Sequence, residues 1–348
     1  MLLRPAFDFF PDHAPKYAKH QSRAPENRSA GDPMKSAFGL GLALALLCAP
    51  AVRADVAFLP DAGRELHVRK DGAAPDGASY RTINEAAQAA QPGDTVVIHG
   101  GIYREQVVPA RGGTAERNRI VYVVAPGERV VVKGSEALAS WQAEGNGVWR
   151  ADVPDAQFGD FNPFATPVAG PHFAGDAWRH LGEVYLDGAP YAEQRTRAAV
   201  EGAAGTWFAQ QDAGLTRIWA NFGAADPTHA LAEINVRPAA FAPAKPGVDY
   251  LTLDGLIFAQ TANNWASLDN QQPAAVSTTG GTHWIIQNCT ITEAKCAALA
   301  LAQPSRDLTR SGPNRPAFGE FEDVEAVGHH LVRNNLIQRC GQAGIFSL

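Results

Sequence analysis

Carboxylates are the side chains of this sequence with the most chemistry to offer. Hydrolysis of a glycosidic bond needs two of them, one held protonated as an acid and one ionised as nucleophile or base. Several occur in or near predicted strands and loops of the C-terminal part. Each alone is more typical of a solvated loop charge, and no spacing marks out a pair. These candidates are Asp269, Glu293, Glu322, Asp323 and Glu325.

One loop combines an aromatic residue with polar side chains in a way that suits a sugar. It runs over residues 263–273, and Trp265 offers an apolar face for stacking. Asp269 and Gln272 can bond hydroxyl groups. We therefore predict Trp265, Asp269 and Gln272 as substrate-binding residues. Packing of Trp265 against the rest of the fold is an equally weighted alternative.

Other catalytic signatures do not occur in the sequence. Its Gly-Gly steps lack the strand-to-helix context of a phosphate site, and there is no Gly-x-Ser-x-Gly elbow. The pair His329–His330 could supply metal ligands, but His330 aligns with Trp284 at the start of a predicted strand, which favours packing. We expect no metal and no cofactor.

The charge and composition of the chain indicate which kinds of partner it binds. The chain has 348 residues, a formal net charge of -6 and only 19% charged residues, with no Lys/Arg block. The balance gives no sign of nucleic-acid or anionic-membrane binding and favours a neutral substrate such as an oligosaccharide. Apart from Cys48, the cysteines are Cys289, Cys296 and Cys340; three are no disulfide framework, and buried packing is predicted for them.

The N-terminus carries an export signal. An apolar run over 37–48 follows Met34-Lys35 and ends in a small-residue site near Ala54, so residues 34–54 read as a signal peptide. We expect a periplasmic or secreted protein. Residues 1–33 do not resemble the start of a signal; they read as non-native upstream sequence, with a disordered extension as the alternative.

A repeat identifies the fold. The stretch from Trp284 has the same pattern as the stretch from His330, with Asn288 aligned on Asn334. This pairs Ile285 and Ile286 with Leu331 and Val332, Ile291 with Ile337, and Leu299 with Ile345. A third stretch, 250–258, puts Asp254 at the Asn position. Asn suits a tight turn because it tolerates positive φ, and such repeats stack as rungs of a solenoid.

The rest of the chain divides around an interruption. Residues 60–134 predict a helix over 80–92, with a Thr82/Glu85 capping box, and then short β-branched strands at 95–99, 100–108, 120–124 and 130–132. Residues 135–240 are rich in Trp and hairpin turns, which predicts a small antiparallel sandwich. Rungs resume over 245–348, with loops at about 260–282 and 303–327.

A set of stretches in this order resembles the β-helical β-xylosidases of glycoside hydrolase family 120. They extend over nearly all of 66–348, and as a set they are specific. They are Tyr80-Arg-Thr-Ile, Pro92-Gly-Asp-Thr-Val-Val-Ile-His99, Gly101-Ile-Tyr-Arg-Glu105, Val132-Lys-Gly-Ser-Glu136, Phe158-Gly-Asp-Phe-Asn-Pro163, Gly182-Glu-Val-Tyr-Leu-Asp-Gly188, Ile218-Trp-Ala-Asn-Phe222, Glu233-Ile-Asn-Val-Arg-Pro238, Trp265-Ala266, Gln272-Pro273, Trp284-Ile-Ile286, Ala294-Lys-Cys296, and Arg333-Asn-Asn335 through Cys340-Gly-Gln342.

The resemblance implies an all-β fold, a right-handed parallel β-helix of the pectin-lyase-like kind with an inserted β-sandwich. It also implies retaining hydrolysis of xylosides by two carboxylates and a homo-oligomer. In the family the catalytic pair follows the Cys-Gly-Gln segment, so we expect it beyond Leu348. The chain then reads as an inactive fragment that lacks C-terminal rungs. A β-helical polysaccharide lyase and a non-catalytic carbohydrate-binding protein remain alternatives.

Overall fold

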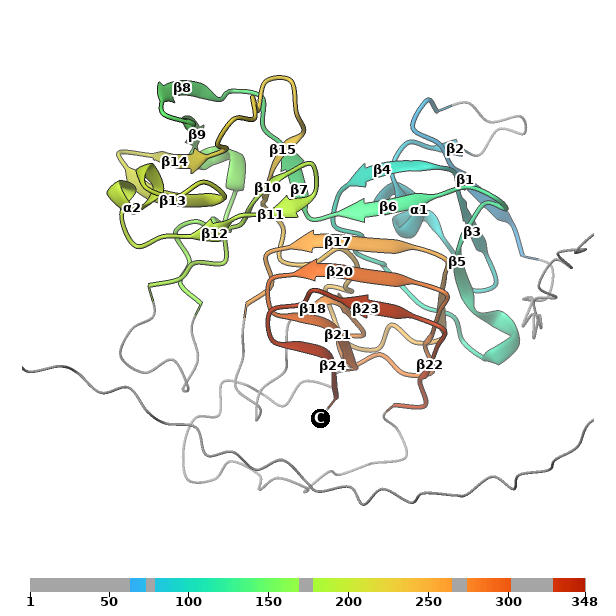
Figure 1. Cartoon of the computed structure of the whole chain (residues 1–348). Coiled ribbons are helices and arrows are strands. Elements are labelled where there is room, and N and C mark those ends of the chain that lie inside the picture. Colours follow the sequence, from blue (N-terminus) through green and yellow to red (C-terminus); the bar gives the residue numbers. More distant parts are fainter. Residues whose placement is uncertain (1–62, 73–78, 169–177, 265–273, 302–327, 348) are drawn as a thin grey trace, which may run out of the picture. The chain divides into compact units, whose positions relative to one another are not determined.

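β-Strands dominate the structure, which is a computed structural model (Figure 1). It describes residues 63–72, 79–168, 178–264, 274–301 and 328–347, all within one compact unit, Val56–Leu348. The predicted all-β fold is confirmed. Residues 1–33 and residues 34–54, predicted to be a signal peptide, lie outside the described residues. Within the described ranges, no helix has the length and apolar character needed to cross a membrane.

Three parallel sheets contain the repeats. The first has the order β2-β1-β3-β5-β16-β19-β22, the second β23-β20-β17-β6-β4 and the third β18-β21-β24. Their strands are β1 (Glu65–Val68), β2 (Ser79–Tyr80), β3 (Thr95–Ile98), β4 (Gly101–Arg104), β5 (Ile120–Val124), β6 (Val130–Lys133), β16 (Leu251–Asp254), β17 (Ile257–Thr261), β18 (Ala274–Ser277), β19 (Ile285–Gln287), β20 (Thr290–Ala294), β21 (Ala297–Leu301), β22 (Leu331–Arg333), β23 (Leu336–Gln338) and β24 (Ala343–Ser347).

Each of the last three repeats sends one strand to each parallel sheet. Thus β16, β17 and β18 form one repeat, β19, β20 and β21 the next, and β22, β23 and β24 the one after it. Every strand pairing in the three sheets is parallel. The predicted register is confirmed: Ile285 pairs with Leu331, Ile291 with Ile337 and Leu299 with Ile345.

The turn between the first and second sheets uses left-handed backbone, as predicted. Asn288 has φ 55° and Asn334 φ 54°. The placement of Asp254 at this position was wrong by one residue: Asp254 pairs with Gln287, and Gly255 (φ 81°) takes the turn position. Gly has no Cβ and adopts positive φ without strain, so this repeat does not need an Asn at the turn. The sequence alignment had assumed an Asn-like residue there. Asp254 instead accepts a hydrogen bond from Asn288 of the next repeat, at 2.8 Å.

The predicted loop at about 260–282 was also partly wrong. Residues 274–277 form β18, which pairs in parallel with β21. Its sequence, Ala-Ala-Val-Ser, has little β-branched character and no alternation, because both faces of this strand are buried. Periodicity therefore gave no signal for it.

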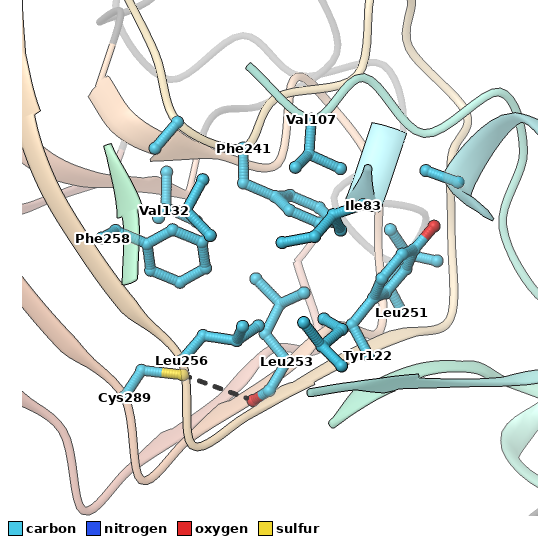
Figure 2. Packing of buried hydrophobic residues seen from close by; sticks show 14 of the residues in the cluster. Ile83, Val107, Tyr122, Val132, Phe241, Leu251, Leu253, Leu256, Phe258 and Cys289 are labelled. Atoms are coloured by element: carbon cyan, nitrogen blue, oxygen red, sulfur yellow. Dashed lines mark hydrogen bonds between the residues drawn. The ribbon is translucent and has the colours of Figure 1, made fainter. Parts of the chain in front are cut away.

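The core of the parallel sheets is aromatic at its centre (Figure 2). Phe241 packs edge-on against Tyr122, Phe258 and Trp284, with ring centroids 5.1, 6.2 and 5.9 Å apart. Isolated parallel bridges also join Phe241 to Val107 and to Val276. The residue thus connects early and late repeats within one apolar cluster.

Helix α1 (Ile83–Ala89) closes part of this core. Thr82 and Glu85 form the predicted capping box, with the Thr82 hydroxyl accepting from the Glu85 N–H at 3.1 Å. The apolar stripe of the helix is buried in the same cluster as the strands. Amphipathic spacing and a cap therefore suffice to place this helix.

The segment between β6 and β16 forms two further sheets, with orders β11-β10-β15-β7 and β12-β13-β14-β9-β8. Their pairings are antiparallel except that of β12 with β13. Side chains of both sheets share one core around Trp207. The predicted Asp187-Gly188 hairpin is confirmed, with φ 50° and 82°. The elements are β7 (Ser135–Ala137), β8 (Gln142–Gly145), β9 (Val148–Pro154), β10 (Val184–Leu186), β11 (Ala189–Pro190), β12 (Ala192–Glu193), α2 (Arg197–Glu201), β13 (Thr206–Asp212), β14 (Leu215–Asn221) and β15 (Ala232–Asn235).

Rings stack across repeats at the turns that precede the first sheet. Three equivalent positions carry these rings, each with φ between 51° and 56°. Tyr250 lies one residue before β16, and His283 and His329 lie two residues before β19 and β22. The Tyr250 and His283 rings are 4.5 Å apart, and the His283 and His329 rings 4.6 Å. The buried Arg119 caps the stack, with its guanidinium 5.5 Å from the Tyr250 ring. The ring stack, and the position of His330 opposite Trp284, agree with the packing role predicted for the His329–His330 pair.

His330 gives this region a pH dependence. Its Nδ1 accepts a hydrogen bond from the Trp284 backbone N–H at 3.2 Å. Burial, with the charges of His283 and His329, lowers the pKa of His330 to about 4 from 6.5. Because the folded pKa lies below the unfolded one, the neutral ring stabilises the fold above pH 6.5, and this contribution is lost as the pH falls towards 4.

We expect acidification from pH 7 to 5 to cost about 2 kcal/mol through His330 alone. The variant His330→Asn keeps an acceptor for the Trp284 N–H but cannot titrate, so its stability should fall by that much less over the same range. Urea unfolding of both proteins at the two pH values measures the difference. Equal losses in the two proteins would contradict this assignment.

Candidate functional site

The inserted sheets meet the parallel sheets around one small apolar cluster. Val168 and Leu181 from the insertion pack with Ala262 and Cys296 from the turns after β17 and β20. Segments 169–177 and 265–273 adjoin this cluster in sequence. Because ligand sites tend to form where two structural units meet, we take this contact as the candidate functional site.

The predicted sugar-binding residues Trp265, Asp269 and Gln272 lie outside the described residues, so they remain predictions. The chain leading into their loop is well anchored. Asn263 is fully buried, donates from Nδ2 to the Ala297 carbonyl at 2.9 Å and accepts from the Thr261 hydroxyl at 3.1 Å. These bonds fix the backbone immediately before Trp265.

Of the five predicted carboxylates, only Glu293 is described, since Asp269, Glu322, Asp323 and Glu325 fall in undescribed segments. The expectation of a solvated charge was wrong for Glu293, which is buried and forms an ion pair with Arg339 of the next repeat. Glu293 and Arg339 occupy equivalent left-handed turn positions, φ 53° and 51°. Stacking of repeats therefore brings the two charges together.

A second carboxylate joins the insertion to the parallel sheets. Glu183 accepts from the Lys295 ammonium at 2.8 Å, and the same ammonium donates to the Gly182 carbonyl at 3.0 Å. Burial raises the pKa of Glu183, and the charge of Lys295 only partly opposes that effect. The carboxylates of Glu193 and Glu293 raise it further.

A buried network around Glu233 forms a second link between these parts. The Glu233 carboxylate is 2.7 Å from both Lys133 Nζ and Arg104 Nη2, and its side chain has no exposed surface. Gln260 donates to it at 3.2 Å. Burial alone would raise the pKa of Glu233, but the hydrogen bonds and charges of Lys133 and Arg104 outweigh burial and hold the pKa below its usual value.

The remaining buried acid of this region, Glu193, binds His180. Its two oxygens lie 2.6 Å from His180 Nδ1 and 2.9 Å from the His180 backbone N–H. The buried phenol of Tyr185 has a pKa well above its ordinary value because of burial and the nearby charges of Glu183, Glu293 and Glu233. The region thus contains several acids that are bonded to Lys, Arg or His side chains.

Such pairing decides what these acids can do. Among the buried carboxylates of the described ranges, Asp94, Glu233 and Glu293 form ion pairs with Arg or Lys, and Glu193 bonds to His180. Glycoside hydrolysis needs a proton-bearing acid facing an ionised nucleophile, both open to the sugar. Among these acids, Glu233 joins the insertion to the parallel sheets, and Glu293 joins two successive repeats. Their bonds to basic side chains suit a structural role.

Sequence reasoning missed Glu183, Glu193 and Glu233 because each lies in or beside a short strand without a motif. Two lysines in apolar surroundings did indicate that buried carboxylates lie nearby. Lys133 follows the apolar run Val130–Val132, and Lys295 lies between two buried strands. A cation in such a place needs a carboxylate partner, since an unpaired buried charge is costly.

Removal of Lys295 tests its pairing with Glu183. In Lys295→Met, Glu183 loses its cation and its pKa rises further, so ionising it becomes more costly as the pH increases. We expect a destabilisation of about 1–3 kcal/mol that is larger at pH 8 than at pH 5. Urea unfolding at both values checks it, with the exposed Lys245→Met as control. A loss independent of pH would contradict the pairing.

Comparisons with known proteins agree with this architecture. Residues 138–205 match the family model for the insertion domain of glycoside hydrolase 120. The solved complex of XylC with xylose is similar, with a TM-score of 0.73 and 32% sequence identity over 81% of this chain and 51% of the XylC chain. A second structure, described as a glycoside hydrolase, has a TM-score of 0.49 and 13% identity, covering 69% of this chain and 64% of its own. A search of curated proteins gave no match.

The sheets and these similarities define the class: the chain is related to the glycoside hydrolases. More particularly, it resembles the β-xylosidases of glycoside hydrolase family 120, and the resemblance predicted from its sequence is confirmed. The chain spans about half the length of the XylC chain it matches.

Proposed function

We propose that the full-length protein is an exported β-xylosidase that releases xylose from xylo-oligosaccharides. The observation that carries this proposal is the similarity to XylC, a protein whose structure was solved with xylose, at 32% identity over 81% of this chain. The match of 138–205 to a family 120 insertion domain supports the same class of enzyme over a lyase or a binding protein. A formal net charge of -6 without a basic block suits a neutral sugar.

The proposed architecture is a right-handed parallel β-helix interrupted by a β-sandwich. Parallel ladders between equivalent strands of successive repeats support the β-helix. The sandwich is supported by two sheets that share one core. The proposed boundaries are 60–134 and 245–348 for the helix and 135–240 for the sandwich.

The proposed chemistry is retaining hydrolysis by two carboxylates about 5–5.5 Å apart. Because the buried carboxylates described here are already bonded to basic side chains, we assign neither role to them. The pair is proposed to lie outside the described residues, after Leu348 as the family resemblance implies. Trp265, Asp269 and Gln272 are proposed to bind the sugar, and the Glu183–Lys295 and Glu233 links to hold their loop in place.

Export by the signal peptide at about 34–54 and assembly as a homo-oligomer complete the proposal. Neither nucleic acid nor a membrane is a proposed partner. Size-exclusion chromatography with light scattering tests the assembly, and N-terminal sequencing of the exported protein tests cleavage near Ala54. An N-terminus still within 34–54 after export would contradict the signal assignment.

Hydrolysis of an aryl β-xyloside by the full-length protein tests the activity. We expect release of xylose, with the β-anomer appearing first in proton NMR spectra because the mechanism retains configuration. Aryl β-glucoside and β-galactoside serve as matched substrates and should react more slowly. First appearance of the α-anomer would contradict the mechanism. Preference for another sugar would contradict the substrate.

The position of the catalytic pair has its own test. We expect the reading frame after codon 348 to encode further repeats with the Asn turn, followed by an Asp and a Glu. Catalysis by the 348-residue chain alone, at the rate of the full-length protein, would contradict this placement.

A further inference from the structure

Two histidine rings face each other on the outer side of the first sheet. His67 lies on β1 and His99 directly follows the neighbouring β3. His67 Nδ1 and His99 Nε2 are 3.1 Å apart. Leu66 and Val68 point into the core, so alternation turns His67 outward. The two side chains are 26% and 14% exposed, which leaves the pair accessible to a small solute.

A carboxylate fixes the protonation of one ring. Glu128 Oε1 lies 2.9 Å from His99 Nδ1, and its other oxygen accepts from the Gly100 N–H. With Glu128 Oε1 as its acceptor, Nδ1 carries the proton of a neutral His99 ring. Nε2 of a neutral His99 is left with its lone pair facing His67.

Carboxylate–histidine pairs of this kind orient metal ligands, because the carboxylate sets the tautomer and increases the basicity of the other nitrogen. The backbone also holds His99 in place: its N–H donates to the Val68 carbonyl at 3.0 Å, and its carbonyl accepts from the Tyr103 hydroxyl at 2.8 Å. His99 is thus a fixed ligand, and His67 is the partner that adjusts.

The spacing of the two nitrogens suits a metal as well. Zn–N bonds of about 2.0–2.1 Å at angles between octahedral and tetrahedral place two nitrogens about 2.9–3.4 Å apart. The observed 3.1 Å lies in this range. Glu65 precedes His67 by two residues on the same face of β1, and its carboxylate is 3.6 Å from His67 Nε2. It adds negative charge beside the pair.

From this geometry we infer a binding site for a divalent transition metal of the Zn²⁺ class, held by His67 Nδ1 and His99 Nε2. Glu128 orients His99, and water completes the coordination. Among the described residues no group of three or more His, Cys, Asp or Glu is placed to hold a metal. The site therefore uses two protein ligands and is weaker than a structural zinc site. Its consequence is a cross-link between β1 and β3, independent of the proposed glycosidase activity.

Calorimetric titration of the metal-free protein with Zn²⁺ tests the inference. We expect one ion per chain, with binding lost in His67→Gln and in His99→Gln. Glu128→Gln should weaken binding about 10–100-fold. His229→Gln is the control, since His229 is 85% exposed and bonds only to Asp226 and Thr228; it should bind as the wild type does.

NMR spectroscopy of the wild-type protein tests the same inference without any substitution, so it holds even if a variant does not fold. Long-range proton–nitrogen spectra should show Zn²⁺ shifting Nδ1 of His67 and Nε2 of His99. Absence of saturable binding would overturn the inference, and so would Zn²⁺ that shifts other nitrogens only. In either case the two rings share a simple hydrogen bond.

Discussion

Replacement of Phe241 by alanine is expected to lower the free energy of unfolding by about 3–5 kcal/mol. Phe241 is 1% exposed and contacts the rings of Tyr122, Phe258 and Trp284; Figure 2 shows the first two beside it. It lies where the chain returns from the insertion and bridges Val107 to Val276. A cavity at this point removes contacts to early and late repeats together, and packed neighbours can collapse into it only partly.

Urea unfolding followed by tryptophan fluorescence measures this loss. Phe208→Ala is the matched control, because Phe208 is only half-buried and stacks on Trp219 at 6.0 Å outside both main cores. Its loss should be about 1 kcal/mol. Equal effects of the two substitutions would show that Phe241 does not occupy the central position described.

Removal of the charge of Glu233 is expected to have a comparable effect. Glu233→Gln leaves Lys133 and Arg104 facing a neutral amide, although their side chains are only 12% and 19% exposed. Breaking one partner of a buried pair costs about 3–5 kcal/mol, because the remaining charges stay desolvated. The insertion and the parallel sheets should lose cooperativity, since this network joins them.

The pH dependence distinguishes this charge effect from a packing defect. The folded pKa of Glu233 is lowered, so its contribution is complete above the unfolded value and is lost as the pH falls through the folded one. The difference between wild type and Glu233→Gln should therefore shrink below about pH 4. Glu201→Gln is the control, because Glu201 pairs with Arg197 on the surface, at 3.4 Å. Its cost should stay below about 1 kcal/mol.

The sequence predicts the repeats well because their physics is local and periodic. Register follows from apolar residues that alternate along each strand, and the Asn turns follow from one left-handed position in each repeat. The strand and turn prediction was wrong at two places where the sequence pattern is weak. Gly255 takes the place of Asn at one turn, and β18 is an alanine-rich strand buried on both faces. A one-residue error at Asp254 was possible because turn chemistry, not the apolar pattern, set that alignment.

The candidate site was harder to predict, because its contacts join residues far apart in sequence. Glu233 meets Lys133, and Glu183 meets Lys295, only after the insertion has folded against the repeats. Neither pair has a spacing that a motif could capture. Glu293 was recognised as a candidate, but its burial depends on Arg339 in the following repeat. The cations embedded in apolar strands were the available clue.

Trapping of the glycosyl–enzyme intermediate tests the central claim most directly. A 2-deoxy-2-fluoro-xylosyl fluoride should label the full-length protein covalently, because a retaining enzyme forms an intermediate that this sugar hydrolyses slowly. Mass mapping of the labelled peptide then identifies the nucleophile. We predict a label on an Asp or Glu outside the described residues. A label on Glu183, Glu193, Glu233 or Glu293, or xyloside turnover without any label, would contradict the account.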